Sequence, residues 1–127
     1  MRTTAPAFVL IAMAQPALAN SAASVNAEQF YLTARELEAK GMTALFDSRS
    51  KPMQQQMKDA GDYARAANAS ATKSGKPLYC VPEAARKKGL NVERVLAILE
   101  KLGTSRRKAM TLDRAWLAAL RGEYPCS

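Results

Sequence analysis

Hydrophobic residues recur at helical spacing through most of the chain. In the first such stretch they follow one another at i, i+4 and i+7, and they are Phe30, Ala34 and Leu37. Asn26 is a good N-cap for this helix, and Gly41 is a residue type that often ends helices. Because apolar residues continue up to Phe46, the pattern also allows a longer first helix that ends there.

A second helix is predicted to begin near Ser50, a candidate cap, with Pro52 in its first turn. One side of this helix carries only small residues, namely Ala60, Gly61, Ala64, Ala66, Ala67 and Ala69. Small side chains let another helix approach closely, although alanine is also simply the best helix former. The polar stretch 68–77 predicts a loop after this helix.

Residues 92–102 carry the clearest helix signals, with Asn91 as the N-cap and Gly103 as the residue that ends the helix. Their inward stripe is Val92, Val95, Leu96, Leu99 and Leu102. Leu90, just ahead of the cap, is expected to pack on Val95.

The remaining segments are shorter. Residues 78–81 are predicted to be extended, since the residue before a proline avoids the helical region, and residues 82–88 to form short helical turns that Gly89 stops. Residues 104–108 read as a basic connection, and a last helix is predicted over residues 111–121. Strand signals are nearly absent.

The start of the chain has the pattern of an export signal. Arg2 precedes the apolar run 6–14, and small residues at and before Ala19 suit a signal peptidase. We predict cleavage after Ala19, with Ala23 as the less favoured alternative. A membrane anchor is the competing interpretation, but the run is far shorter than the roughly 18 residues that span a bilayer.

The predicted organisation is a signal peptide over residues 1–19, a mobile mature N-terminus over residues 20–26 and a helical domain over residues 27–127. Cleavage leaves 108 of the 127 residues, enough for one modest core, and loss of Arg2 lowers the net charge from +8 to +7. For a periplasmic protein this charge favours an acidic protein or the phosphate-bearing envelope as partner. Export makes nucleic acid an unexpected partner, and no stretch after the signal is apolar enough for stable membrane insertion. The charge also serves simply to keep a small protein soluble.

Cys80 and Cys126 are the only two cysteines, and an exported protein usually pairs them. An intermolecular bond or free thiols are the alternatives, and a redox role is disfavoured because the spacing is not Cys-x-x-Cys. The predicted fold class is therefore all-α, a small four- to five-helix bundle stapled by one disulfide.

The sequence contains no catalytic or metal-binding constellation above chance. The absence of histidine removes the usual general base and the commonest metal ligand, and two cysteines alone do not make a zinc site. Asp59 and Asp62 share one predicted helix face, but solvated helix acids are far commoner than catalytic pairs. We predict that the protein is not an enzyme and has no cofactor or metal.

Two basic clusters are the candidate partner-binding residues: Arg86, Lys87, Lys88, Arg106, Arg107 and Lys108. Clusters of this kind suit an acidic protein partner. The plainer interpretation, that each run is a solvated loop, is the commoner one for basic runs.

Three short motifs resemble the Rap/Tai family of exported proteins, whose characterised members are immunity proteins against amidase effectors of type VI secretion. They are residues 78–82 (Leu-Tyr-Cys-Val-Pro), 90–95 (Leu-Asn-Val-Glu-Arg-Val) and 115–126, which end in Tyr-Pro-Cys. The stretch 59–63 is similar to a small-plus-tyrosine helix of that family. Many members have a further cysteine ahead of this tyrosine; here there is none, so only one intramolecular disulfide can form.

The resemblance covers most of residues 28–126, and it implies a periplasmic inhibitor that binds and occludes a peptidoglycan amidase effector. It also implies a homodimer, for which the small-residue helix around Gly61 is the candidate contact. The matching motifs are structural, so no inhibitory residue is carried over from them. The competing expectation is a general envelope protein, such as a small disulfide-bonded chaperone or stress protein.

Overall fold

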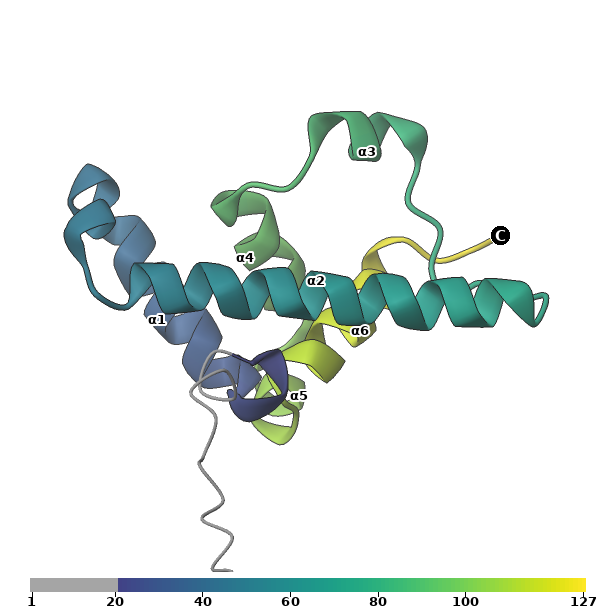
Figure 1. The fold of residues 1–127 in the computed structure, drawn as a ribbon, viewed down its shortest axis with the longest axis horizontal. Coiled ribbons are helices and arrows are strands. Elements are labelled where there is room, and N and C mark those ends of the chain that lie inside the picture. Colours follow the sequence, from purple (N-terminus) through teal and green to yellow (C-terminus); the bar gives the residue numbers. More distant parts are fainter. Residues whose placement is uncertain (1–20) are drawn as a thin grey trace, which may run out of the picture.

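The structure is a computed structural model, and it describes residues 21–127. The signal peptide predicted over residues 1–19 and the cut after Ala19 lie outside the described residues. Within the described range the fold is all-α, and none of its helices is long and apolar enough to cross a membrane (Figure 1). The elements in chain order are η2 (Ala22–Ser24), α1 (Ala27–Ala39), η3 (Gly41–Phe46), α2 (Ser50–Lys73), α3 (Glu83–Lys88), α4 (Val92–Leu102), α5 (Thr104–Ala109) and α6 (Leu112–Glu123), where η denotes a 3-10 helix.

The all-α class and the disulfide are confirmed, and the helix count is higher than the four to five predicted. Two of the extra elements, η3 and α5, begin at glycines with positive φ. Gly41 (φ 60°) ends α1 and the chain continues as the separate η3. Gly103 (φ 91°) ends α4, and the basic connection predicted over 104–108 is the helix α5. Both backbone conformations favour glycine because a Cβ atom is strained there.

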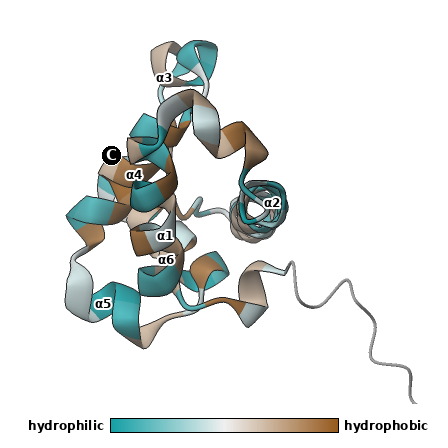
Figure 2. Cartoon of the chain, turned by 90° about the vertical axis from the view of Figure 1, so that its left-hand side faces the viewer, coloured by the Kyte–Doolittle hydropathy of each residue, from teal (hydrophilic) through white to brown (hydrophobic). Residues whose placement is uncertain are grey.

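Helix α6 is the centre of the core. It packs against α2 and α4 and also meets α1, α5 and η2; Figure 2 looks along α2 and shows α4 and α6 to one side of it. Leu112, Ala115 and Trp116 on α6 are fully buried. On α2, Ala60 and Ala64 are fully buried as well, so this part of the small-residue face serves packing within the chain and is not exposed for a dimer contact.

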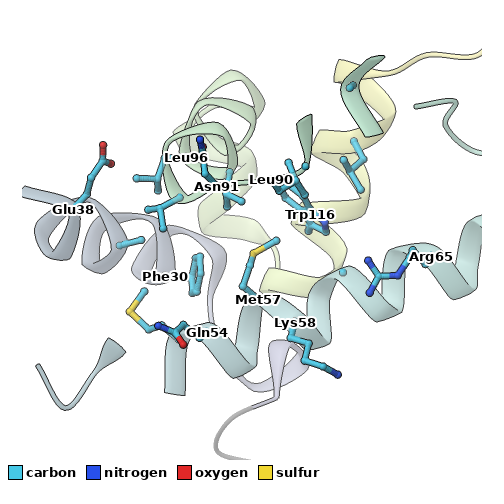
Figure 3. Close-up of a pocket in the computed structure, with 18 of the residues that line it drawn as sticks. Phe30, Glu38, Gln54, Met57, Lys58, Arg65, Leu90, Asn91, Leu96 and Trp116 are labelled. Atoms are coloured by element: carbon cyan, nitrogen blue, oxygen red, sulfur yellow. The ribbon is translucent and has the colours of Figure 1, made fainter. Parts of the chain in front are cut away.

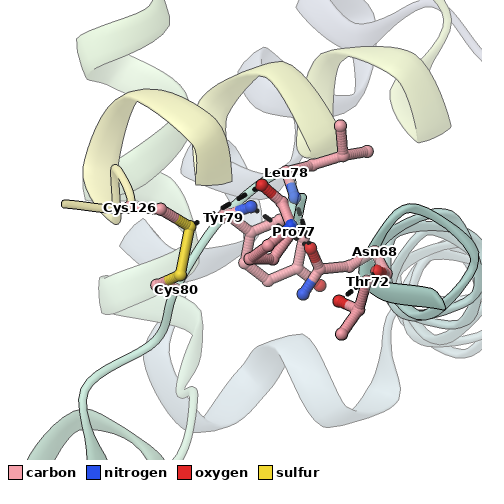
Figure 4. Close-up of a disulfide and its surroundings, with 7 residues drawn as sticks. All are labelled: Asn68, Thr72, Pro77, Leu78, Tyr79, Cys80 and Cys126. Carbon is pink, nitrogen blue, oxygen red and sulfur yellow. Dashed lines mark hydrogen bonds between the residues drawn. A yellow bond between two sulfur atoms is a disulfide. The ribbon is translucent and has the colours of Figure 1, made fainter. Parts of the chain in front are cut away.

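Helix α2 runs on to Lys73, through a stretch predicted to be a loop. The side chain of Asn68 points away from the helix, and its Oδ1 accepts hydrogen bonds from the backbone N–H groups of Leu78 (2.8 Å) and Tyr79 (3.2 Å) (Figure 4). An asparagine that bonds to a distant segment does not compete with its own helix backbone, and the alanines around it favour the helix.

Ala22 and Val25 bond to the helical core, although the sequence predicted a mobile segment over 20–26. Ala22 is fully buried, and its N–H donates to Oδ2 of Asp59 on α2 (2.8 Å). The carbonyl of Val25 accepts from the N–H of Leu112 at the start of α6 (2.9 Å). Backbone bonds of this kind leave no trace in a small, polar composition, which is why the sequence did not predict them. Residue 20 lies outside the described range.

The predicted Cys80–Cys126 disulfide is present, with 5.0 Å between the two Cα atoms (Figure 4). Beside it the N–H of Cys80 donates to the carbonyl of Tyr124 (2.8 Å). The bond therefore ties the end of the chain to the segment that follows α2, and it closes a loop that contains α3, α4, α5 and α6.

Replacing both cysteines by serine should lower the free energy of unfolding. For two cysteines 46 residues apart in sequence, the chain-entropy model gives a loss of about 4 kcal/mol. Urea unfolding of the purified protein measures it, with the reduced wild type as a control that should match the double variant. A loss below about 1 kcal/mol would mean that the enclosed loop is already restricted in the unfolded chain.

Candidate functional site

An apolar groove of about 1290 Å³ is the main candidate site in the described part of the chain. It lies between α2 and the neighbouring elements α1, α4 and α6. Its floor is formed by Phe30, Met57, Leu96 and Trp116, which come from these four helices (Figure 3). Because each helix supplies one part of the floor, the groove exists only once the four helices have packed.

Three exposed hydrophobic side chains line the edge of the groove. Leu45 of η3 is 70% exposed, Leu90 is 55% exposed and Val92 is 59% exposed. The sequence predicted Val92 to face inward, and its exposure contradicts that prediction. Leu90, which was predicted to pack on Val95, leaves more than half of its surface exposed. Exposed apolar residues that gather beside a cavity are typical of a binding surface.

The charged side chains that line the groove are mostly cationic. Lys58 and Arg65 come from α2 and Arg86 from α3, whereas Glu38 is the single acid. Lys58 and Arg65 both pair with Asp62. Hydrogen bonds from Arg65 and then from Lys58 hold the pKa of Asp62 below its usual range.

The segment around α3 forms one side of the groove without being packed itself. Within residues 21–127, α3 packs against no other helix (Figure 1). We call residues 81–91 the α3 segment: it leaves the core beside the disulfide at Cys80 and returns at Asn91, the N-cap of α4. Ala85 and Arg86 from its middle line the groove. The segment is thus held at both ends and free between them.

The structure does not bring the two predicted basic clusters together. The α3 cluster (Arg86, Lys87 and Lys88) is exposed beside the groove, and Lys87 makes a surface ion pair with Glu83 (3.6 Å). In the α5 cluster (Arg106, Arg107 and Lys108), the first and last residues are exposed. Helices α3 and α5 lie at opposite ends of the molecule in both views (Figures 1 and 2).

Arg107 is a structural residue, which corrects its assignment as a partner-binding residue. It is only 4% exposed, and its Nε donates to Oε2 of Glu28 (2.6 Å). Its Nη1 donates to the carbonyl of Leu99 (2.8 Å), and its guanidinium lies 4.0 Å from the centre of the Tyr31 ring. Since residues 104–109 form a helix, consecutive side chains point in different directions, and Arg107 points inward while its neighbours do not.

The two acids considered as a pair, Asp59 and Asp62, have separate structural roles. Asp59 accepts hydrogen bonds from the hydroxyl of Ser21 (3.3 Å) and the N–H of Ala22, whereas Asp62 faces the two α2 cations. Among the described residues, no group of three or more His, Cys, Asp or Glu side chains is placed to hold a metal ion.

Comparison of the chain with models of protein families, with curated proteins and with solved structures gives no match.

The groove was not predicted from the sequence. Its floor residues Leu96 and Trp116 read as ordinary inward positions of amphipathic helices. The one available signal lies at the start of α4, where the apolar residues Leu90 and Val92 flank the polar cap residue Asn91.

We expect Arg107→Met to lower the free energy of unfolding by about 3–5 kcal/mol, because it leaves the buried carboxylate of Glu28 without its partner. Urea unfolding measures the change. The exposed neighbour provides the control, since Arg106→Met should stay within about 0.5 kcal/mol of wild type. Adding Glu28→Gln to Arg107→Met should recover part of the loss. Equal effects of the two arginine variants would contradict the buried role.

Acid should destabilise the fold through paired carboxylates. A hydrogen bond from Lys101 (2.9 Å) is the largest influence on Glu123 and lowers its pKa; burial opposes this, and a hydrogen bond from Arg94 (2.6 Å) lowers the pKa further. A lowered folded-state pKa contributes stability above the unfolded value, about 4.3 for Glu, and that stability is lost as pH falls through the folded value. The free energy of unfolding should therefore be flat from about pH 7 to 5 and fall below about pH 4.

Urea unfolding at a series of pH values tests this with Glu123→Gln. The variant should be less stable than wild type at neutral pH and lose less stability in acid. Glu93→Gln, at an exposed position on α4, is the matched control and should keep the wild-type profile. Superimposable profiles for all three proteins would show that Glu123 has no part in the acid response.

Proposed function

We propose that this protein is a periplasmic, immunity-type inhibitor that binds and occludes a peptidoglycan amidase effector of type VI secretion. The open apolar groove with exposed hydrophobic residues at its edge is the observation that carries protein binding. The amidase as target comes from the Rap/Tai resemblance of the sequence motifs. Inhibition of this kind requires steric occlusion and no chemistry by the inhibitor.

The lining of the groove supports binding without catalysis. Its uncharged polar residues include Ser50, Gln54 and Asn68. None of them has a histidine beside it to act as a base, because the chain contains no histidine. Asn68 is already engaged with the backbone of Leu78 and Tyr79. A nucleophile with an adjacent base is what hydrolytic chemistry needs, and the residues that line the groove do not supply such a pair.

The disulfide is compatible with an exported protein. Cys80 and Cys126 are both exposed to solvent, and an exposed disulfide persists in an oxidising compartment such as the periplasm. The signal peptide proposed over residues 1–19 would direct the chain there. A homodimer, also implied by the resemblance, would need a contact other than the buried Ala60 and Ala64.

A small periplasmic chaperone or stress protein is the second candidate, and the composition of the groove favours it. Met53 and Met57 are flexible side chains that adapt to different apolar clients. Protonation in acid would remove the charge of ion-paired carboxylates such as Glu123, and with it the stability that these pairs contribute. Exposure of apolar surface together with protection of a client protein near about pH 3 would favour this candidate over a rigid inhibitor.

A protection assay tests the inhibitor. The full chain, and a version without residues 1–19, are each expressed beside a periplasm-directed amidase effector encoded in the same gene cluster. We expect cells to survive only with the full chain, and the purified pair to form a stable complex in a pull-down. No rescue and no complex, with the protein present in the periplasm, would leave the chaperone as the better proposal.

A further inference from the structure

We propose that the groove binds an amphipathic helix of a partner protein, with the apolar face of that helix in the groove and acidic residues beside Arg65 and Arg86. The inference rests on the proposed function for the identity of the partner. It adds which surface of this chain recognises the partner and which chemistry the partner presents.

The apolar surface suits a helix. Side chains at i, i+3, i+4 and i+7 of an amphipathic helix form one continuous stripe that fits a hydrophobic groove. Such a helix would cover both the floor around Trp116 and the exposed edge residues Leu90 and Val92. A single lipid chain lying on the floor would leave those two edge residues in water, which makes it the poorer occupant.

The charged residues around the groove favour a partner with a negatively charged surface. On α2 one carboxylate, Asp62, serves both Lys58 (3.2 Å) and Arg65, so one positive charge remains uncompensated there. On the other side of the groove Arg86 adds a second cation that has no ion pair among the described residues. Glu38, the one acid that lines the groove, offsets one of these charges, so the groove keeps a net positive charge. Complementary charges steer a partner and set its orientation. A second copy of this chain, with its net charge of +8, is a poor match for this surface.

The α3 segment gives the groove an adjustable wall. It is held at the disulfide and at Asn91, and in the described structure α3 packs against no other helix. A bound helix would supply α3 with the packing that it lacks and would bring Arg86 against its acidic face. Met53 and Met57 of α2, which also line the groove, adapt to the shape of the incoming side chains.

Two synthetic helical peptides of equal length test the proposal. Both carry leucine on one face, and the remaining positions are glutamate in one peptide and lysine in the other. Trp116 is the only tryptophan and lies on the floor of the groove, so its fluorescence reports occupancy directly. We expect the glutamate peptide to change this fluorescence and to bind at least about tenfold more tightly than the lysine peptide.

Matched variants locate the binding. Leu90→Asp should weaken binding of the glutamate peptide by about tenfold or more, whereas Leu32→Asp should not change it. The two leucines are equally exposed (55% and 57%), and only Leu90 lines the groove. Arg86→Glu should weaken binding, and Arg106→Glu on α5 should not. All four substitutions are at exposed positions and should leave the core intact, which thermal unfolding followed by circular dichroism checks.

Three results would overturn the proposal. The first is equal affinity for the two peptides, and the second is unchanged binding by Leu90→Asp. The third is a change in Trp116 fluorescence with a fatty acid or lysophospholipid when neither peptide produces one, which would make the groove a lipid site.

The protection assay separates this inference from the proposed function. If Leu90→Asp loses both peptide binding and protection, the partner is recognised through the groove. If it loses peptide binding but still protects cells and forms the complex, the inhibitor acts through another surface and this inference fails alone. If the wild type gives no protection, the inhibitor proposal fails, and the peptide titrations still decide what the groove binds.

Discussion

The buried ion pair between Arg107 and Glu28 is the interaction on which the arrangement of the helices depends. Besides the carboxylate, the guanidinium binds the carbonyls of Leu99 (2.8 Å) and Glu100 (3.2 Å) in the last turn of α4. It also donates to the hydroxyl of Thr104 (3.1 Å). A buried charge is tolerated only when its hydrogen-bonding groups are satisfied, so α1, α4 and α5 must meet with this geometry. The shape of the groove floor depends on that junction, because α1 and α4 are two of the four helices that form the floor.

Two further connections act at the opposite end of the molecule. The disulfide holds the C-terminus against the start of the α3 segment, and Asn68 of α2 binds the backbone just ahead of it. Between these anchors and the cap at Asn91, helix α3 packs against no other helix in the described structure. Rigid anchors with an unpacked span between them give a wall that can adjust without unfolding the core.

The basic residues of the chain therefore have different roles in different parts of the structure. Arg107 is part of the core, Arg106 and Lys108 are exposed far from the groove, and Arg86 stands beside it. The combination of an apolar floor, exposed hydrophobic edges and cations at the groove is the basis on which we propose that it binds a protein. This is the physical basis for preferring an inhibitor or a chaperone over an enzyme as the proposed function.

The all-α class, the disulfide and the helix over residues 92–102 were predictable from the amino-acid sequence, and the predicted ends of that helix match the structure. These features depend on local signals, namely a cap, a glycine after the helix and a pair of cysteines. Tertiary packing, in contrast, places Asn68 inside a helix, turns Arg107 inward and leaves Leu90 exposed. Each of these depends on which segment lies opposite, and that is set by the crossing of helices far apart in the chain. The groove belongs to the same category, because four helices must meet before it exists.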